Sequence, residues 1–511
     1  MVQSATTPKD AAAVILLRHH TDPANPEVFW VRRSEGLAFL AGFYAFPGGQ
    51  LDSSDLEAPV LNFQSAEEAA MISCAARELF EELGVLAARG ADSLTQGQRA
   101  SLLDDLESGR MSWPALLRHY DLNLDARDFT FAGRWVTPPF SARRFDTWFF
   151  LVNCPAKQEP QVAPGELESG EWSTAPDAYA RWERSEVPAV PPTLHALRTL
   201  AGGLTHDLVE RFLSVTHAHG EPVRRIEFRP NYICFPVRTP TKPPATHTNC
   251  YLIYTSQSVL VVDPGSPYED EQRALQSVIE DLLDEGRKLS SVLLTHVHPD
   301  HVGGVNGLRS HFGTIRVEAH SLTAEALQES IHVDSWLDDQ DVVELEGKPR
   351  IALRVLHTPG HARGHLCLHE LRTGTLLSGD NIVGLGSVLI DPPEGNMHDY
   401  LKSLERMRSI PNLSVIFPGH GPAIANPYKK IDQYISHRLE REQKILAAVN
   451  EGAATPEEIV ARVYTDVSPK AYAMAERAVL AHLEKLQADQ LIKREGEGWI
   501  ALDHPTRSPE L

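Results

Sequence analysis

The sequence has little cysteine, no long apolar run and no excess of positive charge. Its five cysteines are widely spaced and form no Cys-x-x-Cys pair, so neither a disulfide framework nor a cysteine zinc site is indicated. The apolar run at residues 11–17 is far shorter than the roughly 20 residues needed to span a bilayer. The first ten residues contain no basic segment, so we expect a cytoplasmic protein. The formal net charge of −21 works against non-specific attraction to nucleic acid or to an anionic membrane.

At 511 residues the chain is too long for one hydrophobic core and has about the length of three domains. We predict a multidomain α/β protein and place the domains at residues 9–215, 221–428 and 429–505. Six prolines within residues 221–244 favour a connector there. The alternating apolar residues of that stretch are equally typical of the first strands of the second domain.

Three histidines and one aspartate fall within six residues of the middle domain, directly after an apolar run. They are His296, His298, Asp300 and His301. The apolar run predicts a strand that carries this motif on the loop at its end. Neutral imidazole nitrogens and carboxylate oxygens are zinc ligands, so the motif indicates a metal site more strongly than a polar surface loop.

Other segments of this domain repeat the arrangement: an apolar run ends in a turn that presents one ligand-type residue. These residues are Asp263, His361, Asp380 and His420. Loops that follow strands gather at one edge of a sheet, so we expect these side chains to lie together. His357 and His365 flank the His361 turn, and we interpret them as packing residues or as supports for a ligand.

In this order, the five motifs resemble the metallo-β-lactamase superfamily, an αββα sandwich with its metal site at one edge. The resemblance implies two zinc ions, one bound by His296, His298 and His361 and the other by Asp300, His301 and His420. It also implies that Asp380 bridges the ions, that Asp263 orients a ligand, and that Asp300 has a catalytic role as well. Two zinc ions about 3.5–4 Å apart suit hydrolysis of an ester, thioester or phosphodiester.

The first domain contains an acidic helical segment at residues 77–85, some way beyond a Phe-Pro-Gly-Gly turn at residues 46–49. Glu78, Glu81 and Glu82 share one face of this helix at spacings of three and four residues. Neighbouring carboxylates repel each other and destabilise a helix. A hard cation such as magnesium is therefore a physical reason to place them together.

Residues 77–85 resemble the second half of the Nudix box, Arg-Glu-apolar-x-Glu-Glu-x-Gly-apolar, at every specified position. The resemblance implies an α/β/α sandwich that hydrolyses a diphosphate linked to a nucleoside or a similar group. The three glutamates would bind magnesium or manganese, Arg77 would orient them, and Arg77, Glu81 and Glu82 would be catalytic. Fourteen extra residues between Gly49 and Arg77 leave the first glutamate of the box without a clear counterpart, and either Glu67 or Glu68 could serve.

The long insertion and three downstream segments, residues 134–138, 144–147 and 191–193, look like the Nudix branch associated with coenzyme A and its esters. That resemblance implies a small-molecule substrate such as a nucleotide or a coenzyme A derivative. The acidic loop with Glu166, Glu168 and Glu171 is interpreted as solvated and is left out of the site.

The C-terminal residues predict helices and a short hairpin, the outline of a winged helix. Residues 431–449 form helices readily, Thr455 with Pro456 is typical of an N-cap, and a hairpin is expected at 491–502. In this position the outline is similar to the lactamase-beta-2-like family, whose RNA-cleaving members make single-stranded RNA a further candidate substrate. Residues 455–511 carry 7 basic and 10 acidic side chains, so no basic recognition surface is indicated and packing is the favoured role.

We therefore predict a bifunctional metal-dependent hydrolase, with a di-zinc site in the second domain and a magnesium or manganese site in the first. No membrane partner is expected, and the oligomeric state cannot be inferred. The alternative is a single-activity metallo-β-lactamase-fold hydrolase or endoribonuclease whose Nudix domain is a ligand-binding regulatory module.

Overall fold

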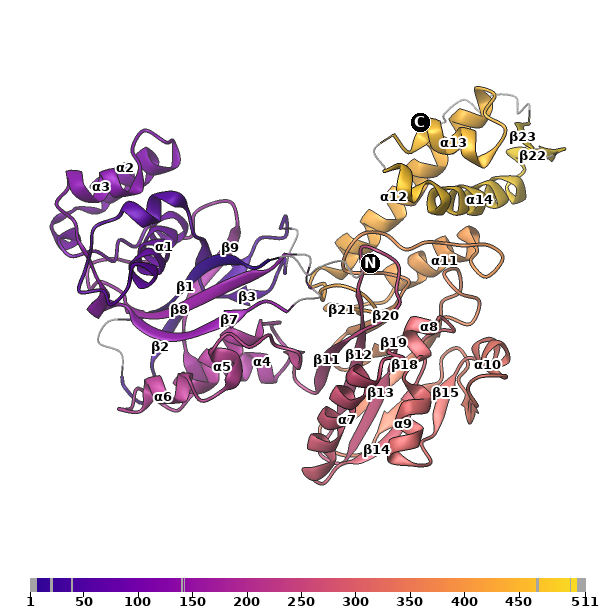
Figure 1. Cartoon of the computed structure of the whole chain (residues 1–511), viewed down its shortest axis with the longest axis horizontal. Helices are drawn as coiled ribbons and strands as arrows, with labels where there is room; N and C mark the ends of the chain where they lie inside the picture. The colour runs from indigo at the N-terminus through magenta and orange to yellow at the C-terminus, as the bar shows by residue number, and fades with distance from the viewer. Residues whose placement is uncertain are drawn as a thin grey trace. The chain divides into compact units, whose positions relative to one another are not determined.

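The computed structural model describes residues 7–18, 22–37, 40–138, 141, 143–465, 468–496 and 498–502. The chain divides into two compact units, Met1–Cys234 and Phe235–Leu511 (Figure 1). The division falls inside strand β11 (Tyr232–Arg238). The last residues of the third predicted domain, 503–505, lie outside the described residues. Across the described part of the chain, no helix is long and apolar enough to cross a bilayer.

A mixed sheet of seven strands forms the centre of the first unit, in the order β3-β2-β1-β8-β7, with β4 paired to β1 and β9 to β2. The central strand β1 is buried from Ala11 to Leu17, as expected of a strand covered on both faces. The strands of this sheet are β1 (Lys9–Leu17), β2 (Glu27–Arg33), β3 (Tyr44–Ala45), β4 (Gly48–Gln50), β7 (Thr130–Val136), β8 (Phe145–Asn153) and β9 (Leu167–Thr174). Shorter strands are β5 (Val60–Leu61), β6 (Leu124–Asp125) and β10 (Ile226–Arg229), the last paired with β11.

Helix α1 (Ala66–Leu83) lies on one face of this sheet, and α4 to α6 lie on the other (Figure 1). The Ser65 side chain accepts a hydrogen bond from the Glu68 N–H at the start of α1, and Gly84 ends the helix in the left-handed conformation at φ 65°. The other helices are α2 (Gln96–Glu107), α3 (Trp113–His119), α4 (Ala175–Glu183), α5 (Pro191–Ala201) and α6 (Leu208–Phe212), with 3₁₀ turns η1 (Ser53–Glu57), η2 (Ala91–Ser93), η3 (Ala126–Asp128) and η4 (Thr216–Ala218).

Two sheets form the second unit, with strand orders β11-β12-β13-β14-β15-β16 and β17-β18-β19-β20-β21. Strands β10 and β11 therefore occupy the stretch for which a connector was one of two predictions. The first sheet contains β12 (His247–Tyr254), β13 (Ser258–Val262), β14 (Lys288–Leu293), β15 (Val317–Ala319) and β16 (Ser335–Trp336). The second contains β17 (Val342–Leu345), β18 (Ile351–His357), β19 (Leu366–Glu370), β20 (Thr375–Gly379) and β21 (Val415–Pro418).

Helices cover the outer faces of both sheets. Leu275 and Ile279 of α7 (Glu269–Asp284) are buried, and α7 packs against β13 and α9. On the second sheet, Tyr400 and Leu404 of α11 (Met397–Arg408) share one apolar cluster with Ile416 of β21. The shorter helices are α8 (Pro299–Val302), α9 (Val305–Phe312) and α10 (Ser321–Leu327).

The chain continues into a long helix, α12 (Pro427–Asn450), which begins on the second sheet and ends in a small module with its own core. Val449 of α12, Ile459 of α13 (Pro456–Val463), Leu483 of α14 (Tyr472–Ala488) and Trp499 are buried together there. Thr455 caps α13 in a reciprocal capping box with Glu458. The module is completed by η5 (Pro469–Ala471) and by the hairpin of β22 (Ile492–Glu495) and β23 (Gly498–Ala501).

Candidate metal centres

The histidines and aspartates of the second unit follow the ends of strands. Asp263 directly follows β13, Asp380 directly follows β20, and His420 comes two residues after β21. The loop after β14 leads to α8, whose first turn contains Asp300 and His301. Strand ends at one edge of the sandwich therefore bring together residues that are more than 150 positions apart in the sequence.

The seven predicted zinc ligands form three overlapping groups whose ligand atoms all lie within 4.8 Å of one another inside each group. The groups are His296 with His298 and His361, His296 with His301 and Asp380, and Asp300 with His301 and His420. Nδ1 of His298 lies 3.0 Å from Nε2 of both His296 and His361. The Asp380 carboxylate lies 3.3 Å from Nε2 of His301 and of His420 and 3.7 Å from that of His361, so it reaches both halves of the cluster.

Each histidine that presents Nε2 to the cluster engages its Nδ1 elsewhere. His361 donates to the Leu389 carbonyl at 3.0 Å, His420 to the His247 carbonyl at 2.8 Å, and His301 to the Asp263 carboxylate at 2.8 Å. Nδ1 of His296 lies 2.9 Å from the Thr295 hydroxyl. A proton held on Nδ1 leaves the Nε2 lone pair free, which is the tautomer that a metal-binding imidazole requires.

Two buried atoms at the centre of the cluster, His301 Nε2 and Asp380 Oδ1, lie 3.3 Å apart, but neither makes a hydrogen bond with the described atoms. Leaving such atoms unpaired costs about 1–3 kcal/mol each unless another group satisfies them. The backbone of Gly419 lies close to Asp380, because a Cβ on residue 419 would lie 2.4 Å from Asp380 Oδ1. Nitrogen and carboxylate oxygen donors in this arrangement fit zinc.

Charge is unevenly distributed within the cluster. Burial disfavours the charged form of His420, but the Asp380 and Asp300 carboxylates outweigh it and raise the pKa of His420 to about 10. Burial, together with the neighbouring His298, lowers the pKa of His361 to about 3. The Asp300 half of the cluster therefore attracts positive charge, and the His361 half presents neutral imidazoles.

Of three groups without a predicted ligand role, Asp263 and His365 support this site and His357 does not reach it. Asp263 accepts from the Thr295 N–H at 2.8 Å and from the Thr295 hydroxyl at 2.6 Å, in addition to His301. The ring of His365 is completely buried and its Nε2 accepts from the Asp380 N–H at 3.1 Å. His357 lies outside the three ligand groups, stacked on His320 with ring centroids 4.1 Å apart.

In the first unit, Arg77 lies among four acceptors. Its Nη1 donates to Glu78 and to Glu81, each at 2.8 Å, and its Nε and Nη2 donate to the Asp55 carboxylate at 3.0 and 2.9 Å. A fifth hydrogen bond reaches the Gln50 carbonyl at 3.0 Å. These carboxylates raise the pKa of Arg77 despite its burial, so the guanidinium stays charged and holds Glu78 and Glu81 in place.

Asp55 is the residue that sequence reasoning missed. It lies in η1, inside the insertion, and its side chain is completely buried against Arg77. Glu67 and Glu68, the two candidates named from sequence, lie in the first turn of α1, about 15 Å along the axis from Arg77. The only sequence feature that could have pointed to Asp55 as the partner of Arg77 is its position, six residues after Gly49.

Glu82 and the Phe-Pro-Gly-Gly turn are in direct contact, because Glu82 accepts from the Gly48 N–H at 2.8 Å. A Cβ on Gly49 would lie within 2.5 Å of the Glu78 carboxylate, so only glycine allows this close approach. Burial is the main cause that raises the pKa of Glu78 to about 7 and that of Glu82 to about 8. The three glutamates thus lie together, and a cation would replace the protons that Glu78 and Glu82 bind near neutral pH.

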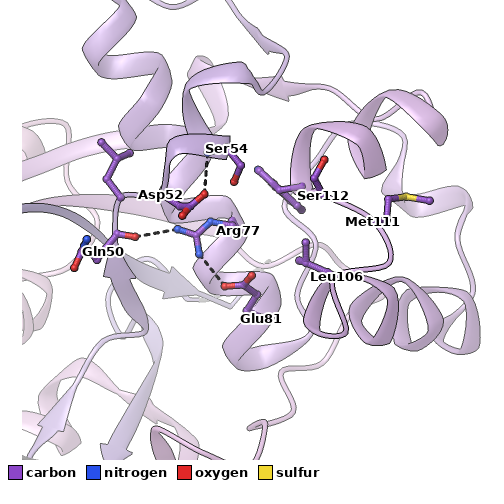
Figure 2. Close-up of a pocket in the computed structure, with 11 residues that line it drawn as sticks. Gln50, Asp52, Ser54, Arg77, Glu81, Leu106, Met111 and Ser112 are labelled. Carbon is purple, nitrogen blue, oxygen red and sulfur yellow. Dashed lines mark hydrogen bonds and ion pairs between the residues drawn. The ribbon is translucent and has the colours of Figure 1, made fainter.

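A cavity of about 500 Å³ opens beside this cluster. Figure 2 shows Arg77 and Glu81 on one side of it, and Leu106, Met111 and Ser112 on the other. Leu106 belongs to α2, and the other two residues lie just before α3. The size is within the range of small-molecule sites, and the lining combines charged and apolar side chains as such sites do.

Sequence comparison places the second unit among known proteins. Residues 243–420 match the family described as the Metallo-beta-lactamase superfamily, and residues 455–499 match the Beta-lactamase associated winged helix domain. A Beta-lactamase-like protein 2 homolog of Caenorhabditis elegans is 31% identical over 250 residues, 48% of this chain and 80% of that protein. Its Drosophila melanogaster namesake is 33% identical over 257 residues, 47% of this chain and 82% of that protein. The chain belongs to the metallo-β-lactamase superfamily.

This superfamily member also carries a Nudix domain, since residues 61–200 match the NUDT19 Nudix domain. A third relative, the atrochrysone carboxyl ACP thioesterase of Aspergillus chevalieri, is 28% identical over 268 residues, 50% of this chain and 78% of that protein. The predicted multidomain α/β fold, both family resemblances, the winged helix and the assignment as a hydrolase are confirmed. The metallo-β-lactamase fold implies bound metal ions, typically zinc.

Proposed function

We propose that the chain is a bifunctional hydrolase, with a di-zinc site in the second unit and a magnesium or manganese site in the first. The observation that supports the zinc site best is the set of outer hydrogen bonds. Four Nδ1 atoms are engaged by groups outside the cluster, so that four Nε2 atoms face one another and two carboxylates. Without a cation this arrangement would place lone pairs against each other, which is unfavourable.

In the proposed reaction, His296, His298 and His361 would hold one zinc ion, Asp300, His301 and His420 would hold the other, and Asp380, which lies close to both sets, would be shared between them. When bound, the two ions supply a nucleophilic water at neutral pH and stabilise the negative charge that develops on the substrate. In the metal-free protein, His420 lowers the pKa of Asp300 even though burial opposes this, and a cation bound at the same place would likewise favour the ionised carboxylate. Asp300 therefore stays ionised, and it orients the attacking water by accepting a hydrogen bond from it.

Within the ester, thioester and phosphodiester classes, we favour a thioester. Support comes from the similarity of half of this chain to a protein named as an ACP thioesterase. The acidic balance of the winged helix, with 7 basic and 10 acidic residues from 455 onwards, gives less support to single-stranded RNA.

For the first unit we propose hydrolysis of a diphosphate in a nucleotide or coenzyme A derivative. Glu78, Glu81 and Glu82 would bind the cation and Arg77 would keep them oriented. The cavity beside Glu81 supports a substrate that places an organic group next to the diphosphate, because Leu106 and Met111 give it an apolar wall. Glu81 contributes to both the cluster and the cavity, so a bound diphosphate would lie between them.

The test is to purify the protein, count its metals and assay three substrate panels: acyl-coenzyme A, nucleotide sugars and single-stranded RNA. His298→Ala and Glu81→Gln are compared with controls of the same residue type, the largely exposed His332→Ala and Glu67→Gln in the first turn of α1. We expect His298→Ala to abolish acyl-coenzyme A hydrolysis, a loss larger than the roughly 10–100-fold that follows removal of a supporting residue. Glu81→Gln should abolish diphosphate hydrolysis alone.

Other outcomes decide between the alternatives. RNA cleavage that disappears with His298→Ala would make the second unit an endoribonuclease. Diphosphate hydrolysis that is absent in the wild type, with nucleotide binding retained, would make the Nudix domain a regulatory ligand-binding module. Wild-type inactivity on every panel, or a protein that binds no zinc, would overturn the proposal for the second unit.

A further inference from the structure

The 381–396 segment joins β20 to α11 without regular secondary structure, and it begins immediately after Asp380. An irregular stretch of this length is uncommon in a compact fold and is usually functional. Here its Leu389 carbonyl accepts the hydrogen bond from His361 Nδ1. The segment therefore determines how His361, a proposed zinc ligand, is oriented.

Two more hydrogen bonds connect the 381–396 segment to the turn that contains His361. The Arg363 N–H donates to Glu394 at 2.9 Å, and the Asn396 N–H donates to the Gly360 carbonyl at 2.7 Å. Contacts on both sides of His361 mean that a shift of the segment moves the imidazole as well. The position of the segment is consequently part of the geometry of the metal site.

The C-terminal helices hold this segment. On α12, the Tyr434 hydroxyl lies 3.1 Å from both the N and the O of Val383, and Arg438, one turn further along, donates to the Val388 carbonyl. On α14, Arg477 donates to the Asp391 carboxylate and to the Pro392 carbonyl. Three side chains from two helices thus hold the segment near its start, beside Leu389 and at residues 391–392.

Arg438 shows that these contacts are directional and are not simply packing. The residue is only 4% exposed, its guanidinium lies over the Tyr400 ring at 5.3 Å from the centroid, and among the described residues no carboxylate pairs with it. Its Nε has no hydrogen-bond partner there either. Burying a cation without a carboxylate partner is costly even beside an aromatic ring, and an apolar side chain of similar size would avoid that cost. A cation is expected at such a place when a donor is needed for a particular carbonyl, here that of Val388.

We propose that the C-terminal module of α12 and α14 positions His361, and thereby sets the zinc affinity of a site to which it contributes no ligand. Arg438 and Arg477 are the positioning residues. They act through the 381–396 segment and the Leu389 carbonyl. This inference rests on the proposed zinc site, and it gives the winged helix a role within the chain itself.

The experiment uses the full-length protein with Arg477→Ala and Arg438→Met. Arg441→Ala is the matched control, because Arg441 also lies on α12 but donates to the Val463 carbonyl and stacks on Tyr464, both within the C-terminal module. Zinc affinity is measured by competition with a chromophoric chelator, and hydrogen exchange is followed over residues 381–396. We expect about tenfold weaker zinc binding and faster exchange of this segment for Arg477→Ala, and neither change for Arg441→Ala.

Arg477→Lys should restore part of the zinc affinity, since a lysine can still pair with Asp391 but is less able to contact Pro392 at the same time. If Arg438→Met does not fold, Arg477, whose side chain is 44% exposed, still provides the test. Faster exchange of the segment with unchanged zinc affinity would overturn the inference, as would an equal loss of affinity in Arg441→Ala. A wild-type protein that binds no zinc would instead overturn the proposed function, while the exchange measurements would still show whether Arg477 holds the segment.

Discussion

The two candidate metal centres keep their ligands together by opposite means. In the second unit the ligands come from four strand ends, and the outer nitrogens of four histidines are each fixed by a separate carbonyl, hydroxyl or carboxylate. In the first unit the three glutamates come from one helix, and a single guanidinium, Arg77, contacts two of them. The histidine site is thus oriented by several independent groups. The glutamate site instead depends on the Arg77 guanidinium and on the protons bound by Glu78 and Glu82.

The two centres therefore differ in how strongly one substitution outside the ligands disturbs them. Removing one outer partner of the histidine site loosens one ligand, because the others keep their own partners. Removing the residue that holds Arg77 releases Glu78 and Glu81 together and leaves a buried cation with fewer partners. We therefore expect the largest single-residue effect in the first unit, although its ligands are contiguous in sequence.

The first prediction concerns Asp55→Ala. Asp55 and Arg77 are both buried and share two hydrogen bonds, so removal of the carboxylate leaves a buried charge that is only partly compensated. We expect the free energy of unfolding of the first unit to fall by roughly 3–5 kcal/mol. Chemical denaturation followed by tryptophan fluorescence measures this. Asp52→Ala, which loses only the cap of η1, should cost about 1 kcal/mol, and equal losses for the two variants would contradict the comparison.

The second prediction changes an orienting aspartate of the other centre. Asp263→Asn retains the shape of the side chain, but an amide has one oxygen where the carboxylate accepts from the Thr295 N–H, the Thr295 hydroxyl and His301. We expect zinc affinity to fall by about 10–100-fold with the magnesium affinity of the first unit unchanged. Isothermal titration with zinc and with magnesium measures the two affinities separately. Asp281→Asn, an exposed position of α7, is the control and should change neither affinity.

The third prediction uses the protons of the glutamate site. The pKa of Glu78 is raised to about 7 and that of Glu82 to about 8, so the metal-free fold gains stability at low pH and loses it as the pH rises through this window. Magnesium needs the ionised form, so its affinity should increase with pH, by about tenfold per unit for each displaced proton, and level off above pH 8. Titration in buffers of different ionisation enthalpy counts the released protons. A magnesium affinity that is flat between pH 6 and 8 would show that these glutamates are already ionised.

The two centres also differ in how much of each could be predicted from the sequence, because their ligands are held by different kinds of group. The seven ligand-type residues of the second unit could be named because each follows an apolar run, and strand ends converge at one edge. The groups that orient them, such as the carbonyls of Leu389 and His247, could not be named, because a carbonyl has no signature in the residue pattern.

In the first unit the helix spacing was sufficient to place Glu78, Glu81 and Glu82 together, since one helix face needs no tertiary information. The partner of Arg77 was not found, because the contact depends on how the insertion folds back over α1. The insertion forms η1, whose capping box between Asp52 and Asp55 turns the chain towards Arg77. A local turn of this kind is not visible as a periodic pattern, whereas Glu67 and Glu68, the two candidates named from the sequence, lie nearer to Arg77 along the chain.

The last prediction has the smallest expected effect. It tests whether His357 is a zinc ligand or only packs beside the ligands of the second unit. His357 stands four residues before His361, but its Nε2 donates to the Arg363 carbonyl at 2.9 Å and its ring stacks on His320. In His357→Gln the amide can replace that hydrogen bond, so we expect unchanged zinc stoichiometry, an affinity within about twofold and a loss of stability of no more than about 1 kcal/mol. Metal analysis with thermal unfolding measures all three. Loss of one zinc ion would show that His357 is a ligand, and the assignment of His357 as a packing residue would then be wrong.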